Sequence, residues 1–431
     1  MVDAIVSFGV EKLWELVSEN YERFQGVEEQ ITELKSDLKM LMSFLSDADA
    51  RKQTTALARN CVDDVKEITY DAQDIIETYL LKRERSESSG IKKHMRSLAC
   101  IQSGRRKTAL EITNISTRIS KVIQVMRDFG IQSNIIEGGY SQALQDRKRE
   151  MRHTFPIESE TNLVGLEKNV EKLVEELVGN DSSLGVSITG LGGLGKTTLA
   201  RQVFNHDKEE SFIKIVSDPA SSSSVHSQAS SRSRRLVVYC TDTFNGEREM
   251  KNSKLRSLLF IPVDYWFMKR SNFMELPLLR ILDLFGARFE GGKLSSSIGK
   301  LIHLKYLSLD EAEVTHLPSS LRNLKSLLYL NLDIRPGLMT DVPNVFKEML
   351  ELRYLWLPWR TTSRTKLELG NLLKLETLEN FSTKHSSVTD LHSMTRLRTL
   401  RICISGEGWC MENLSSTLSK LGHLEDLTIR S

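Results

Sequence analysis

The sequence predicts a multidomain α and α/β protein: a bundle of helices, then a short α/β segment, then a solenoid of repeats. Three observations predict this order. Apolar residues follow a helical spacing through the first 130 residues, a glycine-rich phosphate-binding pattern lies near residue 190, and leucines recur regularly from about residue 255. A chain of 431 residues is long enough for two to four domains.

Bulk composition excludes several classes of protein. The chain is 40% apolar and 27% charged, as folded domains are, and its net charge of +2 gives no overall field that would attract nucleic acid. The five cysteines are scattered without a CxxC pair, which favours free thiols over a disulfide framework or a zinc site. We find no secretion signal and no stretch apolar enough to span a bilayer, so we expect a cytoplasmic protein.

Charge is unevenly distributed along the first third of the chain. Residues 1–80 contain 8 Lys and Arg against 17 Asp and Glu, whereas residues 81–155 contain 16 against 7. Such runs are most often solvated faces of helices. The alternative is an acidic surface that docks on a basic surface of the same molecule.

Apolar stripes with alternating spacings of three and four predict three amphipathic helices, and a weaker helix is expected from about Ala4 to Asn20. Four such helices favour a compact four-helix bundle over residues 1–130. The polar segment from Lys82 to Lys107 is expected to be a flexible loop. The stripes are Ile31, Leu34, Leu38, Leu41, Leu45 and Ala48; Val65, Ile68, Ala72, Ile75 and Tyr79; and Ile112, Ile115, Ile119, Val122 and Met126.

The first helix has two alternative roles, as an element that inserts into a membrane or as part of the bundle core. Its polar side is acidic, which suits adsorption to anionic lipid poorly and favours the core. The expected apolar side is Ile5, Phe8, Leu13, Leu16 and Val17, and the acidic side is Asp3, Glu11, Glu15 and Glu19.

A phosphate-binding loop is the strongest chemical signal. Residues 190–198 fit the pattern G-x-x-x-x-G-K-[ST], with a short β-type run before them and a helix-like segment after them. Its glycines let successive backbone N–H groups point at phosphate oxygens, next to the positive end of a helix. Lys196 is expected to reach the β- and γ-phosphates, and Thr197 to hold Mg²⁺. The expected nucleotide-binding residues are Gly190, Gly192, Gly193, Leu194, Gly195, Lys196, Thr197 and Thr198.

A nucleotide-hydrolysing domain also needs an acidic residue at the end of a second apolar strand. Two segments have the right composition, Leu236–Asp242 and Leu307–Glu311. The second is in register with the repeats and is expected to be structural. The first follows a basic triplet and a serine-rich tract, where a buried strand is not expected. No catalytic residue is assigned.

The repeats have the pattern L-x-x-L-x-x-L-x-L. The third leucine of each unit recurs every 22 to 27 residues, which is the periodicity of leucine-rich repeats. The third leucines are Leu258, Leu282, Leu307, Leu330, Leu355, Leu378, Leu400 and Leu427.

Residues between the leucines are expected to face the concave surface of the solenoid. Aromatic residues dominate the energetics of interfaces, so a column of Tyr306, Tyr329 and Tyr354 beside Trp356 is a candidate partner-binding patch. The alternative is that tyrosine is simply common at these positions. Ser308, Asn331 and Arg401 are expected on the same surface.

In this order, the three parts resemble the coiled-coil class of plant nucleotide-binding leucine-rich-repeat disease resistance proteins. Val65–Glu77 resembles the family's acidic bundle motif, with Gln73 in place of an acid. Asn162–Glu167 resembles the entry to the nucleotide domain (NB-ARC), residues 190–200 match its phosphate loop, and Arg234–Tyr239 resembles the entry to the repeats.

The resemblance implies a receptor that holds ADP at rest, exchanges it for ATP when a pathogen is sensed, and then oligomerises. It implies Mg²⁺ with the nucleotide, and a pathogen effector or a guarded host protein as partner. It also implies self-association or binding to full-length receptors through the bundle, and peripheral association with the plasma membrane on activation. Asp71, Asp74 and Glu77 would dock the bundle on a basic patch of the repeats.

The chain departs from the family in one respect, because only about 60 residues separate Lys196 from the first repeat. We therefore expect most of the NB-ARC domain to be missing and the nucleotide switch to be impaired. The expected parts are a bundle at 1–130, a linker at 131–160, a truncated nucleotide-binding segment at 161–212, a serine-rich junction at 213–250 and repeats at 251–431. The alternative function is that of a non-enzymatic interaction protein that modulates full-length receptors.

Overall fold

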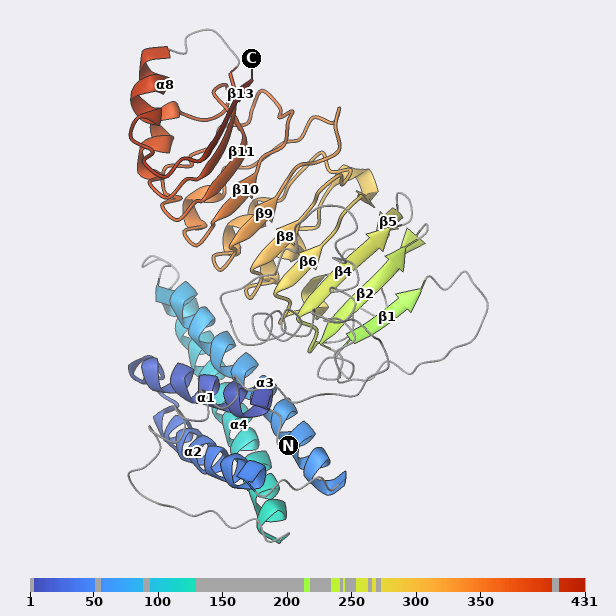
Figure 1. The fold of residues 1–431 in the computed structure, drawn as a ribbon, viewed down its shortest axis with the longest axis vertical. Helices are drawn as coiled ribbons and strands as arrows, with labels where there is room; N and C mark the ends of the chain where they lie inside the picture. The colour runs from blue at the N-terminus through green and yellow to red at the C-terminus, as the bar shows by residue number, and fades with distance from the viewer. Residues whose placement is uncertain are drawn as a thin grey trace, which may run out of the picture. The chain divides into compact units, whose positions relative to one another are not determined.

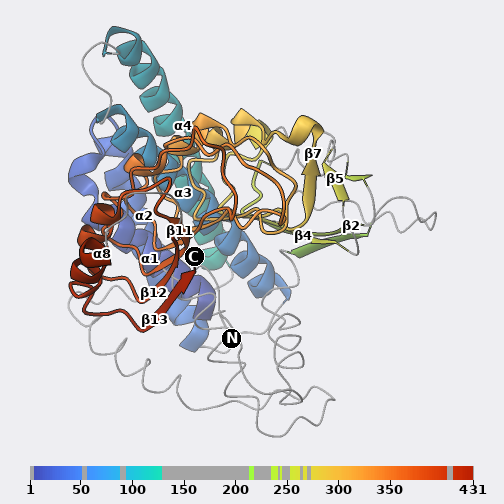
Figure 2. The ribbon, with the colours of Figure 1, turned by 90° about the horizontal axis from the view of Figure 1, so that it is seen from above.

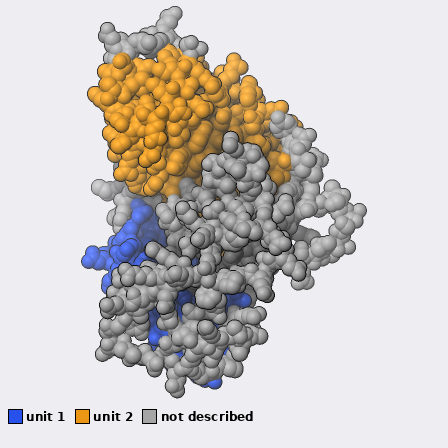
Figure 3. Space-filling view, viewed as in Figure 1, with its two compact units in different colours: residues 1–204 blue, residues 205–431 orange. Residues whose placement is uncertain are grey.

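The computed structural model describes the helices of the first 128 residues and most of the chain from residue 213. The described ranges are 4–50, 56–87, 94–128, 213–217, 234–240, 243–244, 253–262, 266–268, 273–404 and 411–430. The chain divides into two compact units, residues 1–204 and residues 205–431 (Figure 3). The phosphate loop and the linker before it lie outside the described residues.

The described residues of the first unit form four α-helices, as the apolar stripes predict (Figure 1). Leu34, Leu38 and Leu41 of the second helix and Ile115 and Ile119 of the fourth are at most 3% exposed, so these stripes form the core of the bundle. The helices are α1 (Ala4–Glu19), α2 (Glu28–Ala50), α3 (Ala56–Glu87) and α4 (His94–Asp128), with a short 3-10 helix at Tyr21–Arg23.

Helix α1 contributes one face to this core. Leu13 and Val17 are buried as expected, and so are Val6 and Val10, which the sequence analysis did not select. Leu16 is only partly buried. No helix in the described ranges is both long enough and apolar enough to cross a bilayer.

The prediction of a flexible loop from Lys82 to Lys107 is wrong for most of that segment. Helix α3 continues to Glu87 and helix α4 begins at His94. The segment lacks an apolar stripe, but it is rich in Lys, Arg and Glu, which are good helix formers, and it contains no proline. Polar ends of this kind extend amphipathic helices into solvent, and Glu84 of α3 forms an ion pair with Arg23 at 2.6 Å.

The second unit is built on a ten-stranded parallel sheet whose strands follow one another in chain order (Figure 1). Its strands are β1 (Ile213–Ser217), β2 (Arg235–Cys240), β4 (Ser257–Pro262), β6 (Ile281–Asp283), β8 (Tyr306–Ser308), β9 (Tyr329–Asn331), β10 (Tyr354–Trp356), β11 (Thr377–Ser382), β12 (Thr399–Cys403) and β13 (Asp426–Arg430). This architecture confirms the solenoid.

The leucines of the repeat form one ladder through the sheet. Leu282 pairs with Leu307, Leu307 with Leu330, and so on to the end of the solenoid. All the third leucines from Leu258 to Leu400 are 0% exposed, whereas Leu427 in the last strand is 41% exposed. Because every repeat buries its leucines against the next, the core is continuous along the solenoid.

A second, smaller sheet and short helices complete the repeats. The three-stranded sheet contains β3 (Thr243–Phe244), β5 (Trp266–Met268) and β7 (Ala287–Phe289), and Figure 2 shows β5 and β7 apart from β2 and β4. The last repeat has an α-helix, α8 (Met411–Leu418). The 3-10 helices between strands are Phe273–Glu275, Glu290–Gly292, Ser296–Lys300, Ser319–Asn323, Phe346–Glu348 and Val388–Ser393.

The expectation that the segment Leu236–Asp242 forms no buried strand is wrong, because residues 235–240 form β2 within the repeat sheet. Leu236 is 3% exposed and pairs with Leu258, so it occupies the leucine position of an additional repeat strand. Sequence reasoning missed this strand because it stands alone, without the leucines that precede the strand in the later repeats. Residues 213–250, expected to form a serine-rich junction, therefore include three strands.

Candidate partner-binding face

The register of the sheet brings the predicted tyrosines together. Tyr306 pairs with Tyr329, and Tyr329 pairs with Tyr354, so the three residues occupy the same position on adjacent strands. In a strand, successive side chains point to opposite faces. Because the leucine after each tyrosine is buried in the core, the tyrosines lie on the other face of the sheet, here called the tyrosine face.

The aromatic rings of this face contact one another. Tyr306 and Tyr329 stack with ring centroids 4.3 Å apart and planes 13° apart. Trp356 lies 4.9 Å from Tyr329, and Tyr354 lies 6.2 Å from it, both tilted by about 40°. All four predicted patch residues are therefore in one half-buried cluster, as the column in the sequence predicts.

Ser308 and Asn331 alternate with the tyrosines on the same face, but they are only 3% and 7% exposed. The Asn331 side-chain oxygen accepts a hydrogen bond from the backbone of Asp333 at 2.7 Å, and the Ser308 hydroxyl accepts one from Asp310 at 3.4 Å. These two residues shape the turns that follow their strands. The rings and the residues after the strands form the accessible part of the face.

Three aspartates flank the aromatic cluster. Asp283 ends β6, whereas Asp310 and Asp333 each come two residues after a strand. Burial raises the pKa of the Asp283 carboxyl, and the nearby Asp310 charge raises it further. Burial also raises the pKa of Asp310 and Asp333, with the charge of Glu311 adding to both effects. The four carboxylates thus lie within electrostatic range of one another.

The acidic group also affects the tyrosines. Burial raises the pKa of the Tyr306 phenol strongly, and the charge of Asp283 raises it further. Burial raises the pKa of Tyr329 as well. Both phenols are therefore neutral hydrogen-bonding groups at ordinary pH. Sequence reasoning missed the aspartates, although each directly follows a core leucine in the printed sequence.

The carboxyl-terminal part of the sheet contains both acidic and basic side chains. Arg401 of β12 contacts Glu379 of β11 at 3.1 Å, and the guanidinium of Arg430 lies 4.7 Å from the ring centre of Trp359. Burial raises the pKa of the Glu379 carboxyl, while the Arg401 charge opposes that effect. Glu379 is thus ion-paired, as is Glu376 beside Tyr354, which contacts Arg353 at 3.6 Å, whereas the aspartates near Tyr306 and Tyr329 form no ion pair among the described residues.

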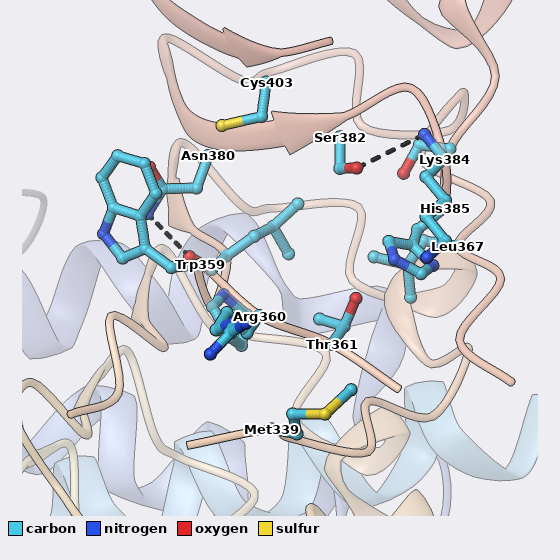
Figure 4. A pocket seen from close by; sticks show the side chains of 13 residues that line it. Met339, Trp359, Arg360, Thr361, Leu367, Asn380, Ser382, Lys384, His385 and Cys403 are labelled. Carbon is cyan, nitrogen blue, oxygen red and sulfur yellow. Dashed lines mark hydrogen bonds between the residues drawn. The ribbon is translucent and has the colours of Figure 1, made fainter. Parts of the chain in front are cut away.

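A pocket of about 290 Å³ lies among the segments that end and follow β10, β11 and β12 (Figure 4). Asn380, at φ +60°, forms a bulge there and donates a hydrogen bond to the Leu357 carbonyl at 2.9 Å. The lining residues are Met339, Leu357, Pro358, Trp359, Arg360, Thr361, Leu367, Asn380, Ser382, Lys384, His385, Ser386 and Cys403.

The acidic motif of the bundle lies on α3. The Asp71 carboxylate pairs with Arg118 of α4 at 2.8 Å, and Glu77 accepts a hydrogen bond from Gln73 at 2.9 Å. Asp74 is only 4% exposed. The structure therefore places the three predicted acids on one helix, and at least Asp71 already has a partner within the bundle.

The expected nucleotide-binding residues lie outside the described residues. Gly190, Gly192, Gly193, Leu194, Gly195, Lys196, Thr197 and Thr198 consequently remain predictions. Among the described residues no group of three or more His, Cys, Asp or Glu side chains is arranged to hold a metal ion.

Comparison with known families divides the chain in the same order. The family model of the Rx N-terminal domain matches residues 5–107, that of the NB-ARC domain matches residues 166–238, and that of a leucine-rich repeat region matches residues 254–431. The NB-ARC match ends inside β2. We assign β2 to the repeats because its pairing with β4 continues their leucine ladder.

Curated relatives match over the whole chain. A relative from Arabidopsis thaliana named as a disease resistance protein, At1g59780, is 44% identical over 728 positions, which cover 100% of this chain and 80% of the relative. Disease resistance proteins RF9 and RXW24L of the same plant are 30% and 32% identical, and the matches cover 70% and 81% of their lengths. A solved leucine-rich repeat ectodomain of an Arabidopsis thaliana receptor kinase matches 46% of this chain and 24% of its own length at 19% identity, with a TM-score of 0.34.

The alignment to the first of these relatives also shows how many of its positions this chain lacks. It spans 728 positions, whereas this chain has 431 residues, so 297 positions have no counterpart in this chain. The match to an NB-ARC domain is correspondingly short. With its Rx N-terminal domain, partial NB-ARC domain and leucine-rich repeats, the chain belongs to the family of plant disease resistance proteins.

Proposed function

We propose that this chain acts in plant immunity by binding protein partners through the tyrosine face of its repeats, with a nucleotide switch that is impaired. The observation that carries the proposal is the contiguous aromatic cluster of Tyr306, Tyr329, Tyr354 and Trp356. Clustered, half-buried aromatic residues provide much of the binding energy of protein interfaces. By resemblance, the partner is a pathogen effector or a guarded host protein.

The phosphate loop supports ADP or ATP as the ligand of the central segment. Glycines at 190, 193 and 195 free the backbone to surround phosphates, Lys196 supplies the positive charge, and Thr197 supplies a hydroxyl for Mg²⁺. A bound nucleotide would thus be held by its phosphates. Such binding alone does not make a switch.

The position of β2 argues that the switch is impaired. Fewer than 40 residues separate Lys196 from Arg235, where the repeat sheet already continues. A nucleotide domain with a second acidic strand needs more chain than this. The strand that could have supplied the acid, residues 235–240, pairs with the first leucine-rich repeat.

The bundle favours a second candidate function, the modulation of full-length receptors. Its four helices share a core of their own, so it can present a surface for self-association. We further propose that Asp71, Asp74 and Glu77 dock on a basic row of the repeats. Arg256, Arg280 and Lys305 form such a row, because each donates its backbone N–H to the carbonyl of the basic residue one repeat before it, at 2.6 to 2.8 Å.

Proximity labelling in leaves tests the proposed function. The full chain, fused to a biotin ligase, is compared with the double variant Tyr329→Ala/Trp356→Ala and with the control Leu373→Ala, whose side chain is 56% exposed elsewhere in the repeats. We expect the double variant to lose a set of labelled proteins that the control retains. Identical labelling by all three proteins would refute partner binding by this face.

Cellular location is tested in the same leaves. The resemblance implies a cytoplasmic protein that associates peripherally with the plasma membrane on activation. Fractionation of the labelled extracts before and after immune stimulation measures both populations. If the chain never enters the membrane fraction, its association with the plasma membrane on activation is refuted.

A further inference from the structure

We propose that the tyrosine face binds a positively charged segment of its protein partner, one that carries two or more arginine or lysine side chains in an extended conformation. This inference rests on the proposed function and names the chemistry of the partner. It follows from the combination of stacked aromatic rings with a group of carboxylates that forms no ion pair in the described part of the chain.

The carboxylates lie on three adjacent repeats. Asp283 pairs in register with Ser308 of the next strand, two residues before Asp310. The backbone N–H of Glu311 donates to the carbonyl of Asp333 at 2.9 Å, which places the two turns next to each other. The acidic group therefore crosses the strands β6, β8 and β9 at the edge of the aromatic cluster.

The residues around this group neutralise it only in part, because the Arg401 charge lowers the pKa of Asp333 against the larger effect of burial, and no positive side chain acts on Asp283 or Asp310 among the described residues. Among the described residues, Asp283, Asp310, Glu311 and Asp333 form no ion pair, whereas Glu379 on the same sheet pairs with Arg401. Burial and mutual repulsion raise the pKa of all three aspartates. A cation that approached this edge would relieve both effects.

The aromatic rings favour the same kind of ligand. A guanidinium or ammonium group over the face of tyrosine or tryptophan is attracted by the ring's negative face. The same interaction occurs among the described repeats, where Arg430 lies 4.7 Å from the centre of Trp359. Tyr306, Tyr329 and Trp356 are aromatic rings near the carboxylates of the tyrosine face.

The distance between the carboxylates favours an extended peptide segment over a single cation as the ligand. Neighbouring strands lie about 4.8 Å apart, so carboxylates on three successive strands spread over about 10 Å. No three acidic groups of the described residues converge closely enough to hold a metal ion. In an extended peptide, alternate side chains lie about 7 Å apart on one side, which matches the spread of the acidic edge. Arginine suits the site better than lysine, because its flat guanidinium both stacks on rings and forms two hydrogen bonds to a carboxylate.

Peptide binding to the purified full chain tests this inference. The probes are fluorescent octapeptides of sequence (Gly-Arg)4, (Gly-Lys)4, (Gly-Gln)4 and (Gly-Glu)4, and fluorescence anisotropy reports their affinity. We expect binding in the order arginine, lysine, glutamine, with no binding of the glutamate peptide, and a fall in affinity as salt is added.

Two triple variants separate the site from the general acidity of the chain. Asp283→Asn/Asp310→Asn/Asp333→Asn removes three charges from the tyrosine face and should weaken binding of (Gly-Arg)4 about tenfold or more. Glu290→Gln/Glu348→Gln/Glu368→Gln changes the net charge equally at exposed positions elsewhere in the repeats, and should change binding less than about twofold.

Equal weakening by the two triple variants, or equal binding of the arginine and glutamine peptides, would overturn the inference. The proposed function is tested separately, because the Tyr329→Ala/Trp356→Ala variant reports on any partner of the face. If that variant loses labelled proteins in leaves while the peptides show no dependence on the aspartates, the face binds partners but not through their positive charge.

Discussion

The rings of Tyr306 and Tyr329 stack 4.3 Å apart because their strands pair in register at one step of the leucine ladder. Each of the strands β8, β9 and β10 thus contributes to two parts of the structure. Its leucine fills the core, and the tyrosine before the leucine contributes a ring to a continuous surface. Partner binding by this surface therefore depends on the same periodicity that builds the fold.

The stack itself is measurable. Aromatic pairs contribute about 0.5 to 1.5 kcal/mol beyond the burial of their area. In a double-mutant cycle with Tyr306→Leu and Tyr329→Leu, we expect a coupling free energy of this size from urea unfolding of the full chain. A cycle with Tyr306→Leu and the more distant Tyr354→Leu provides the control, and a coupling equal to that of the first cycle would contradict the stack.

The close approach of two repeats predicts a strong effect at Gly299. A methyl group added there would lie against the carbonyl oxygen of Ser320 and 2.6 Å from its side-chain carbon. We expect Gly299→Ala to lower the free energy of unfolding by about 1 to 3 kcal/mol. Gly422 has no heavy atom within 4 Å of an added methyl group, so Gly422→Ala should have little effect. Similar losses in both variants would disagree with this packing.

The raised pKa of Asp283, Asp310 and Asp333 predicts how stability depends on pH. Because the folded pKa lies above the ordinary value of 3.8, ionisation of these groups costs stability above the folded pKa, and the cost disappears as pH falls toward 3.8. The triple Asp→Asn variant should therefore be more stable than the parent at pH 7, and this advantage should shrink near pH 4. If the stability advantage of the triple variant grew as the pH fell, ionisation of these aspartates would stabilise the fold, contrary to this prediction.

The ion pair between Asp71 and Arg118 predicts a role for the acidic motif inside the bundle. Their side chains are 14% and 34% exposed, so the pair is partly shielded from water. We expect Asp71→Asn to lower the free energy of unfolding of the helices by about 1 kcal/mol, measured by circular dichroism. Glu111→Gln, which breaks the more exposed pair with Lys107, should cost less than about 0.5 kcal/mol. Equal effects would mean that Asp71 is not held by Arg118.

Much of the fold follows from periodicity in the sequence. The stripes around Leu38 and Ile119 predict buried helical faces, and the recurring leucines predict the sheet, because both patterns reflect what must be buried. The polar ends of α3 and α4 could not be found in this way, since a solvated helix has no apolar stripe. Strand β2 was missed because its single leucine, Leu236, is not preceded by the other leucines of the repeat pattern.

The candidate site was predictable only in part. The tyrosine column can be read from the sequence because its members repeat at the period of the fold. The importance of Asp283, Asp310 and Asp333 depends on which residues neighbour them across three repeats, and on the absence of an ion pair to them among the described residues. A single sequence does not contain that information. Likewise, the pairing of Asp71 with Arg118 joins residues that are 47 positions apart.

A defence assay in leaves tests whether the chain acts through its repeats and not through a nucleotide switch. It compares the full chain with Lys196→Ala and with Tyr329→Ala/Trp356→Ala at equal protein levels. If the chain acts through its repeats with an impaired switch, Lys196→Ala keeps the defence response of the parent and the aromatic double variant loses it. A response abolished by Lys196→Ala and unchanged in the double variant would contradict action through the tyrosine face, and would show a working nucleotide switch instead.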